Sequence, residues 1–104
     1  MKEKSCNIPL DSKTEIFVKF GCEKKDISKF AVLLFLYYNK KWMNIDRFDT
    51  SHGYVHRDVI GKDGMKKRTE KFSFLSFKSG LNIAIEFYKE NYESCVRRFL
   101  DEKL

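Results

Sequence analysis

Up to residue 74, the chain is a succession of short segments whose side chains either alternate between polar and apolar or are apolar throughout. Residues 14–20 alternate and are rich in β-favouring side chains, which predicts a strand with one buried face. Residues 30–38 are apolar throughout, which is typical of a central strand covered on both faces, and Phe35 within them is a predicted core residue. Strand character returns in residues 42–49, 56–60 and 65–74.

The period of the apolar pattern changes after residue 76. From Leu81 to Leu100, apolar side chains recur at steps of three and four residues, which predicts a long amphipathic helix over about residues 77–101. Ser76 or Ser79 can serve as its N-cap, because a serine hydroxyl can accept a hydrogen bond from the first turn of a helix. One helix laid across a twisted antiparallel sheet buries the apolar faces of both.

The predicted fold class is therefore α+β, with an antiparallel meander sheet of four to five strands and one long C-terminal helix packed on a face. The Asp63-Gly64 pair favours a tight hairpin turn between the last two strands. Residues 1–13 are polar and contain the only proline, so we expect a loosely ordered N-terminal arm. Residues 14–104 then form a single α+β domain.

Composition narrows the classes of partner and compartment. The chain has 21 Lys and Arg against 15 Asp and Glu, and its net charge of +6 favours phosphate-rich or acidic partners. The three cysteines show no CxxC spacing, which argues against a disulfide framework or a zinc ribbon and favours a reducing compartment. The apolar run at 30–38 is much shorter than the roughly 20 residues of a membrane span, and no signal-peptide pattern precedes it. We expect a cytoplasmic protein that does not interact with a membrane.

Reactive side chains concentrate in residues 49–58, which contain both histidines of the chain. Histidine is the side chain whose ordinary pKa lies nearest neutrality, so two of them can move protons. His56 and Asp58 point to one face if they share a strand, and His52 joins them if the bend at Gly53 preserves the alternation. We predict His52, His56 and Asp58 as catalytic residues for attack of a ribose 2′-OH on its own phosphodiester, with neither a metal ion nor a cofactor.

Basic side chains surround this cluster along the sequence. Arginine binds phosphate oxygens in a bidentate manner, and a lysine-rich hairpin beside a His-Arg site attracts a nucleic-acid backbone. The predicted nucleic-acid-binding residues are Arg47, Arg57, Lys66, Lys67 and Arg68.

The same residues allow two other interpretations. His52 and His56, with Asp49 and Asp58, offer nitrogen and oxygen ligands suitable for a transition metal. Alternatively, the carboxylates pair with nearby arginines and stabilise the bend, while the histidines are packing groups. Lysines on a hairpin also protect a sheet edge from aggregation without binding anything.

Residues 47–58, R-F-D-T-S-H-G-Y-V-H-R-D, resemble small prokaryotic proteins with an R-[YF]-D-x-x-H-G-x-x-H core, related to TumE-type toxins of toxin–antitoxin pairs. Those families carry Asp-Asn after the aromatic residue and a further histidine two positions past the second one. This chain has Asp49-Thr50 and Asp58 at those places. The resemblance implies a cytoplasmic, toxin-like protein with an antitoxin-like partner.

The leading functional hypothesis is thus a toxin-like protein of a poorly characterised family that acts on or binds RNA through its His/Arg/Asp cluster, as a metal-independent, ribonuclease-like enzyme. The alternative is a non-enzymatic protein-interaction module in which the same cluster is structural. The geometry of the histidines discriminates between them: two rings that converge on one cleft beside Arg47 or Arg57 favour chemistry.

Overall fold

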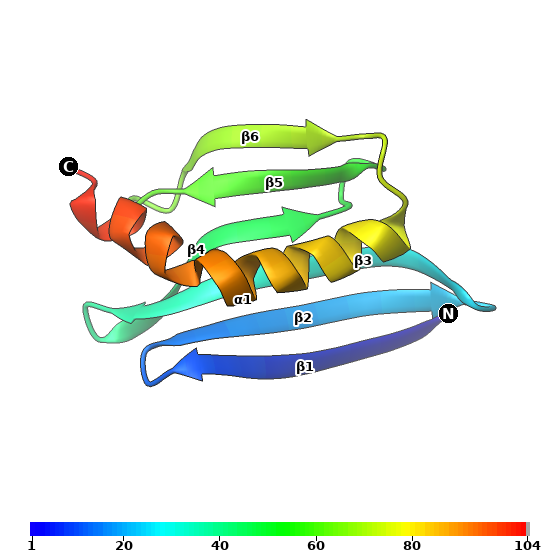
Figure 1. The fold of residues 1–104 in the computed structure, drawn as a ribbon, viewed down its shortest axis with the longest axis horizontal. Coiled ribbons are helices and arrows are strands. Elements are labelled where there is room, and N and C mark those ends of the chain that lie inside the picture. Colours follow the sequence, from blue (N-terminus) through cyan, green and yellow to red (C-terminus); the bar gives the residue numbers. More distant parts are fainter. Residues whose placement is uncertain (104) are drawn as a thin grey trace.

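The computed structural model describes residues 1–103. Six strands are followed by one helix (Figure 1). The elements are β1 (Lys2–Asp11), β2 (Thr14–Glu23), β3 (Asp26–Tyr38), β4 (Lys41–Asp49), β5 (Val55–Ile60), β6 (Lys66–Phe72) and α1 (Phe77–Asp101).

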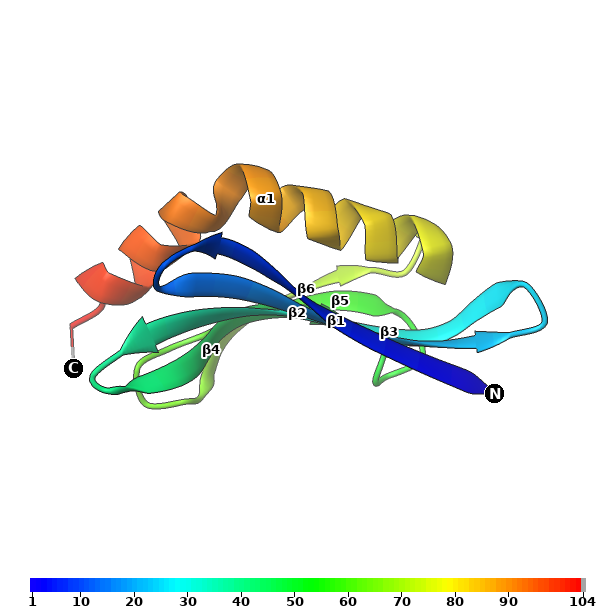
Figure 2. The same ribbon diagram turned by 90° about the horizontal axis from the view of Figure 1, so that it is seen from below.

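All neighbouring strands are antiparallel, and their order in the sheet is their order in the chain. Figure 2 shows α1 lying across one face of the sheet, and no described element covers the other face, which we call the open face. The predicted α+β class with one C-terminal helix on an antiparallel sheet is confirmed. No described helix is long and apolar enough to cross a membrane.

The predicted number of strands was wrong, because the sheet has six strands and not four to five. The added strand is β1, which lies within the segment 1–13 that we expected to be a loosely ordered arm. β1 is an edge strand, and most of its side chains are exposed, so it has no apolar alternation to reveal it. It is held by backbone hydrogen bonds of an antiparallel ladder with β2, which runs from Lys2 opposite Cys22 to Asp11 opposite Thr14.

The core lies between α1 and the face of the sheet that it covers. Ile16, Val32 and Leu34 from the sheet are fully buried there together with Tyr88 and Phe99 from the helix. Burial of apolar surface at roughly 25 cal/mol per Å² is the main force that holds the two layers together.

The first turn of α1 approaches the sheet closely. Ser76 is the N-cap, as one of the two predicted candidates, and its hydroxyl accepts a hydrogen bond from the backbone N–H of Ser79. A Cβ atom on Gly80 would lie 2.7 Å from a methyl carbon of Val55, so the small residue permits this contact with β5.

Strand alternation divides the charged residues of β4 and β5 between the two faces. One row across the sheet, Val32–Phe48–Arg57, faces the helix, and the next row, Ala31–Asp49–His56, lies on the open face.

The burial of side chains along β3 follows the same division between the two faces. Its residues alternate between buried and half-buried, so the prediction that both faces of 30–38 are covered was wrong, and Phe35 is half-buried on the open face.

A bulge in β4 sets this register. Leu34 pairs with Asp46 and Phe35 pairs with Asn44, which leaves Ile45 without a partner opposite it. The Asn44 side-chain amide donates hydrogen bonds to the backbone carbonyls of Leu34 and Asp46, at 3.1 and 2.8 Å, and so stabilises the bulge.

Candidate functional site

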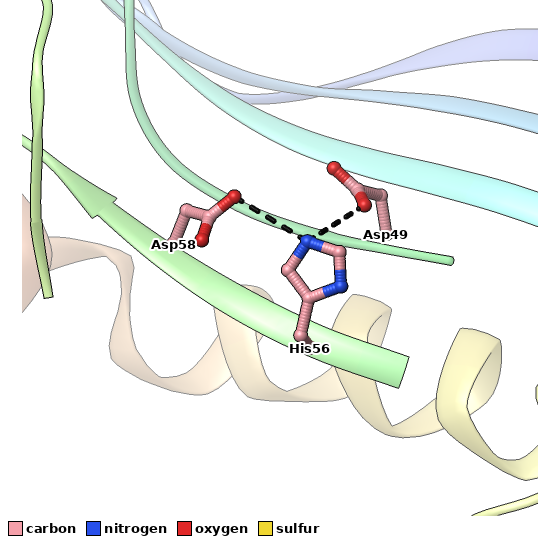
Figure 3. Close-up of side chains that lie close together, drawn as sticks. All are labelled: Asp49, His56 and Asp58. Atoms are coloured by element: carbon pink, nitrogen blue, oxygen red, sulfur yellow. Dashed lines mark ion pairs between the residues drawn. The ribbon is translucent and has the colours of Figure 1, made fainter. Parts of the chain in front are cut away.

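Three side chains converge on the open face: Asp49 at the end of β4, and His56 and Asp58 on β5 (Figure 3). Asp49 lies directly opposite His56 in the ladder, and Asp58 follows His56 by two residues on the same face. The sequence predicted that His56 and Asp58 share a face, and the structure places them so.

The imidazole of His56 lies between the two carboxylates. Its Nε2 is 2.9 Å from Oδ1 of Asp49 and 3.5 Å from Oδ2 of Asp58. The His56 and Asp58 side chains are 1% and 0% exposed, which is rare for such residue types and requires compensation by neighbouring groups. Nevertheless, no described residue forms a hydrogen bond of proper geometry with His56 Nε2.

Neighbouring hydroxyl, amide and guanidinium groups hold both carboxylates in place. Thr69 donates its hydroxyl to Oδ1 of Asp58 at 2.8 Å, and Nε of Arg47 donates to Oδ2 at 3.1 Å. Ser51 donates both its backbone N–H and its hydroxyl to Oδ1 of Asp49, at 3.0 and 2.8 Å. The carboxylates are therefore oriented before any ligand arrives.

The pKa of Asp58 is lower than that of an ordinary aspartate. Burial opposes its ionisation, but the hydrogen bonds from Thr69 and Arg47 and the nearby charge of Lys66 outweigh burial. Asp58 is therefore an anion at neutral pH, despite its full burial.

The second histidine is close to the first but lies in a different environment. The ring centroids of His52 and His56 are 5.0 Å apart, and His52 is exposed on the turn between β4 and β5. Gly53 in that turn has φ of +86°, a conformation that favours glycine. The structure therefore brings the three predicted catalytic residues together, but only His52 is reachable from solvent.

The predicted phosphate-binding residues divide between the faces. Arg47 and Lys66 lie on the open face, where Nζ of Lys66 is 3.6 Å from Oδ2 of Asp58. Arg57 instead points to the helix side and pairs with Asp46. Arg68 pairs with Glu70, and Lys67 with Asp63. Only two of the five predicted cations therefore adjoin the cluster.

Two lysines outside the predicted set of nucleic-acid-binding residues flank the cluster. The register runs Lys19–Ala31–Asp49–His56–Lys71 from β2 to β6 across the open face, so a lysine lies on each side of the cluster. Alternation within each strand predicts which face a lysine occupies, but its distance from the cluster depends on which strands pair and in which register. Asp49 was considered only as a metal ligand or an arginine partner, yet it contacts His56 more closely than Asp58 does.

A hollow of about 400 Å³ adjoins the cluster, and its lining combines carboxylate, hydroxyl, ammonium and apolar groups. It is lined by Lys19, Phe20, Lys29, Phe30, Ala31, Asp49, Thr50 and Ser51. This lining extends the site from β5 towards β2.

The whole chain matches a known protein family. One family model, described as "Domain of unknown function (DUF7718)", matches residues 1–104. The chain belongs to the DUF7718 family. No curated protein and no solved structure matches it significantly.

The burial of His56 limits what the DUF7718 site can do chemically. A general base must come within hydrogen-bond reach of the proton that it removes. His56 Nε2 is enclosed by its own carboxylates, so His56 suits a role as a ligand or as a positioning residue better than direct proton transfer to a substrate. The exposed His52 is the imidazole that a substrate could meet.

Proposed function

We propose that this DUF7718 domain binds the phosphodiester backbone of RNA on the open face of its sheet. The observation that carries the proposal is the arrangement of cations around the cluster: Arg47 and Lys66 adjoin Asp58, and Lys19 and Lys71 flank the row that contains His56. Clustered cations on one face supply most of the affinity of a protein for nucleic acid.

Aromatic side chains beside these cations favour single-stranded RNA over a duplex. The rings of Tyr54 and His52 are 6.2 Å apart, and Nζ of Lys71 lies 5.7 Å from the centre of the Tyr54 ring. Unpaired bases stack on such rings, whereas bases in a duplex do not reach them.

A toxin-like activity would add chemistry to this binding. In that case His52 acts on the substrate as acid or base, while His56 and Asp58 position the turn behind it. The resemblance of residues 47–58 to the toxin-type core supports a cytoplasmic, toxin-like protein with an antitoxin-like partner. The identity of the adjacent gene tests the proposed toxin–antitoxin pairing, because we expect it to encode a small antitoxin-like protein.

Binding of a labelled single-stranded RNA, followed by fluorescence anisotropy over a series of salt concentrations, tests the proposal. The open-face variant carries Lys19→Ala, Lys66→Ala and Lys71→Ala. The matched control carries Lys67→Ala, Arg68→Ala and Lys89→Ala, which remove the same charge from the edge and the helix side. We expect weaker binding of the open-face variant, and a salt slope lower by about 0.7 for each lost contact.

Equal losses in the two variants would show that only net charge matters and would contradict a defined face. The absence of RNA binding by the parent chain would contradict the proposal altogether and favour the non-enzymatic protein-interaction module.

A further inference from the structure

We propose that Asp49, His56 and Asp58 bind one divalent transition-metal ion of the zinc class on the open face. A role of this ion in RNA recognition rests on the function proposed above. Binding of the ion itself can be tested without RNA. The ligand atoms are Oδ1 of Asp49, Nε2 of His56 and a carboxylate oxygen of Asp58, which all lie within 4.8 Å of one another.

The distances between these atoms match a coordination shell. Zinc–nitrogen and zinc–oxygen bonds of about 2.0–2.1 Å at tetrahedral angles separate neighbouring ligand atoms by about 3.3 Å. His56 Nε2 lies 2.9 Å from the Asp49 oxygen and 3.5 Å from the Asp58 oxygen. These two distances lie within a few tenths of an ångström of the ideal separation, and all three ligand atoms lie within 4.8 Å of one another, so small movements of the side-chain ends would complete the shell on the protein side.

The orientation of His56 is the second, independent observation. Figure 3 shows Nε2 pointing between the two carboxylates, and its hydrogen-bond geometry is satisfied by no described residue. The other ring nitrogen, Nδ1, lies 3.4 Å from the backbone carbonyl of Tyr54. A hydrogen bond from Nδ1 to a carbonyl is the usual support of a metal-binding histidine, because it leaves the Nε2 lone pair for the metal.

Electrostatics requires a positive charge at this position. A buried Nε2 lone pair that faces two carboxylates is repelled by both, so either a proton or a metal ion must lie between them. A proton on Nε2 would stabilise the cluster by hydrogen bonds, but the direction of the ring does not aim it at either oxygen. A metal ion between the three ligand atoms would supply the positive charge that the two carboxylates require. The imidazole nitrogen selects a transition metal over Mg²⁺ or Ca²⁺.

Arg47 and Lys66 determine how tightly the ion is held. Both place a cation near Oδ2 of Asp58, at 3.1 and 3.6 Å, and therefore oppose a metal cation there. Their side chains are 31% and 47% exposed, so they can turn towards solvent or towards a phosphate. Three protein ligands leave at least one coordination position, which a water molecule or a phosphate oxygen of RNA can take.

Titration of the chelator-treated full chain with Co²⁺ and Zn²⁺ tests the site. We expect one Co²⁺ per chain with visible absorption bands of low coordination number, and displacement of Co²⁺ by Zn²⁺ but not by Mg²⁺. Asp49→Asn should abolish binding, and it removes the most exposed of the three ligands, so folding should survive. His52→Gln is the matched control and should bind normally. Arg47→Gln should tighten binding, because it removes a competing charge.

Histidine ¹⁵N NMR of the parent chain provides a test that no folding defect can confound. Zn²⁺ should shift the His56 Nε2 resonance and leave His52 nearly unchanged. A His56 ring that is protonated on both nitrogens and insensitive to Zn²⁺ would overturn the proposal in favour of an imidazolium held by ion pairs. Loss of Co²⁺ binding in His52→Gln, with retention in Asp49→Asn, would overturn it in favour of adventitious binding at the surface.

The two proposals fail in different ways. RNA binding that persists in chelator, together with no metal binding, would refute the ion and leave the proposed function intact. Stoichiometric metal binding without RNA binding would refute the proposed function and leave the ion site intact.

Discussion

Asp46 and Asp49 lie three residues apart on β4, and each is the acidic centre of a buried polar cluster, but on opposite faces of the sheet. On the helix side, Oδ1 of Asp46 accepts hydrogen bonds from the hydroxyl of Tyr88 at 2.6 Å and from Nε of Arg57 at 2.9 Å. Its Oδ2 accepts hydrogen bonds from Nη2 of Arg57 at 2.9 Å and from Nη2 of Arg98 at 3.5 Å. Both oxygens of Asp46 are therefore satisfied.

The open-face cluster also joins carboxylates to hydroxyl and guanidinium groups, but one of its buried polar atoms lacks a hydrogen bond. Asp49 and Asp58 are held by Ser51, Thr69 and Arg47, whereas Nε2 of His56 lacks a hydrogen bond from any described residue. Buried polar groups in folded proteins are almost always satisfied, so an exception calls for an explanation. The satisfied helix-side cluster therefore suits a role in stabilising the fold, and the unsatisfied atom on the open face supports the proposed ligand site.

Chemistry on the helix side agrees with a structural role. Burial raises the pKa of the Cys95 thiol to about 11, so this thiol is a poor nucleophile at neutral pH. Burial and the adjacent Asp46 raise the pKa of Tyr88 well above its ordinary value, so its hydroxyl stays a proton donor. Burial opposes the charge of Arg57, but the hydrogen bond and charge of Asp46 raise its pKa further. These groups keep one protonation state over the physiological range of pH.

Substitution of the two aspartates is the strongest test of this comparison. Asp46→Ala should lower the free energy of unfolding by about 3–5 kcal/mol, because it leaves the Arg57 charge and the Tyr88 hydroxyl without their buried partner. Asp49→Ala, measured in chelator, should cost less than half as much. Urea denaturation of both variants measures the difference. Equal costs would show that the two clusters do the same structural work.

Neighbouring residues of β3 test the same division for apolar side chains. Leu34 is fully buried beneath α1, so Leu34→Ala should cost about 2–5 kcal/mol. Phe35 is the larger residue but lies half-buried on the open face, so Phe35→Ala should cost less than about 2 kcal/mol. Thermal unfolding of the pair measures the order. A greater loss for Phe35→Ala would indicate that something covers the open face.

The elements with strong periodicity were predictable from the sequence. The change from a period of two to a period of three to four predicted α1, with its cap at Ser76 or Ser79, and the Asp63-Gly64 turn predicted the hairpin of β5 and β6. The edge strand β1 was missed, because exposed side chains carry no periodic signal and its pairing is made by backbone groups.

The sites were less predictable, because they depend on which strands are neighbours. The proximity of His56 to Asp58 follows from alternation within one strand, but the contact of Asp49 with His56 requires the pairing of β4 with β5. The bulge at Ile45 changes the face of every residue before it relative to those after it. Unbroken alternation along residues 42–49 would put Asn44 and Asp46 on one face, whereas the bulge separates them, and no local signal marks that bulge.

The pH dependence of stability offers a smaller but more specific test of the open-face cluster. A carboxylate whose pKa is lower in the folded chain than in the unfolded chain contributes stability above its unfolded pKa of about 3.9. That contribution disappears as the pH falls through the lower, folded pKa. The pKa of Asp58 is lowered, so its contribution should be complete near neutrality and be lost only in acid.

Asp58→Asn isolates this effect, since the amide oxygen can still accept the hydroxyl of Thr69 but carries no charge for Arg47. Hydrogen bonds to charged groups are worth roughly 1.5–3 kcal/mol, so the parent chain should exceed the variant by about that amount near neutral pH. The difference should shrink towards zero as both are titrated into acid, through the lowered folded pKa of Asp58, in urea denaturation series with chelator present. A difference that stays constant into strong acid would show that the charge of Asp58 contributes nothing to stability. The asymmetry between the faces would then have to arise from the orientation of His56 alone.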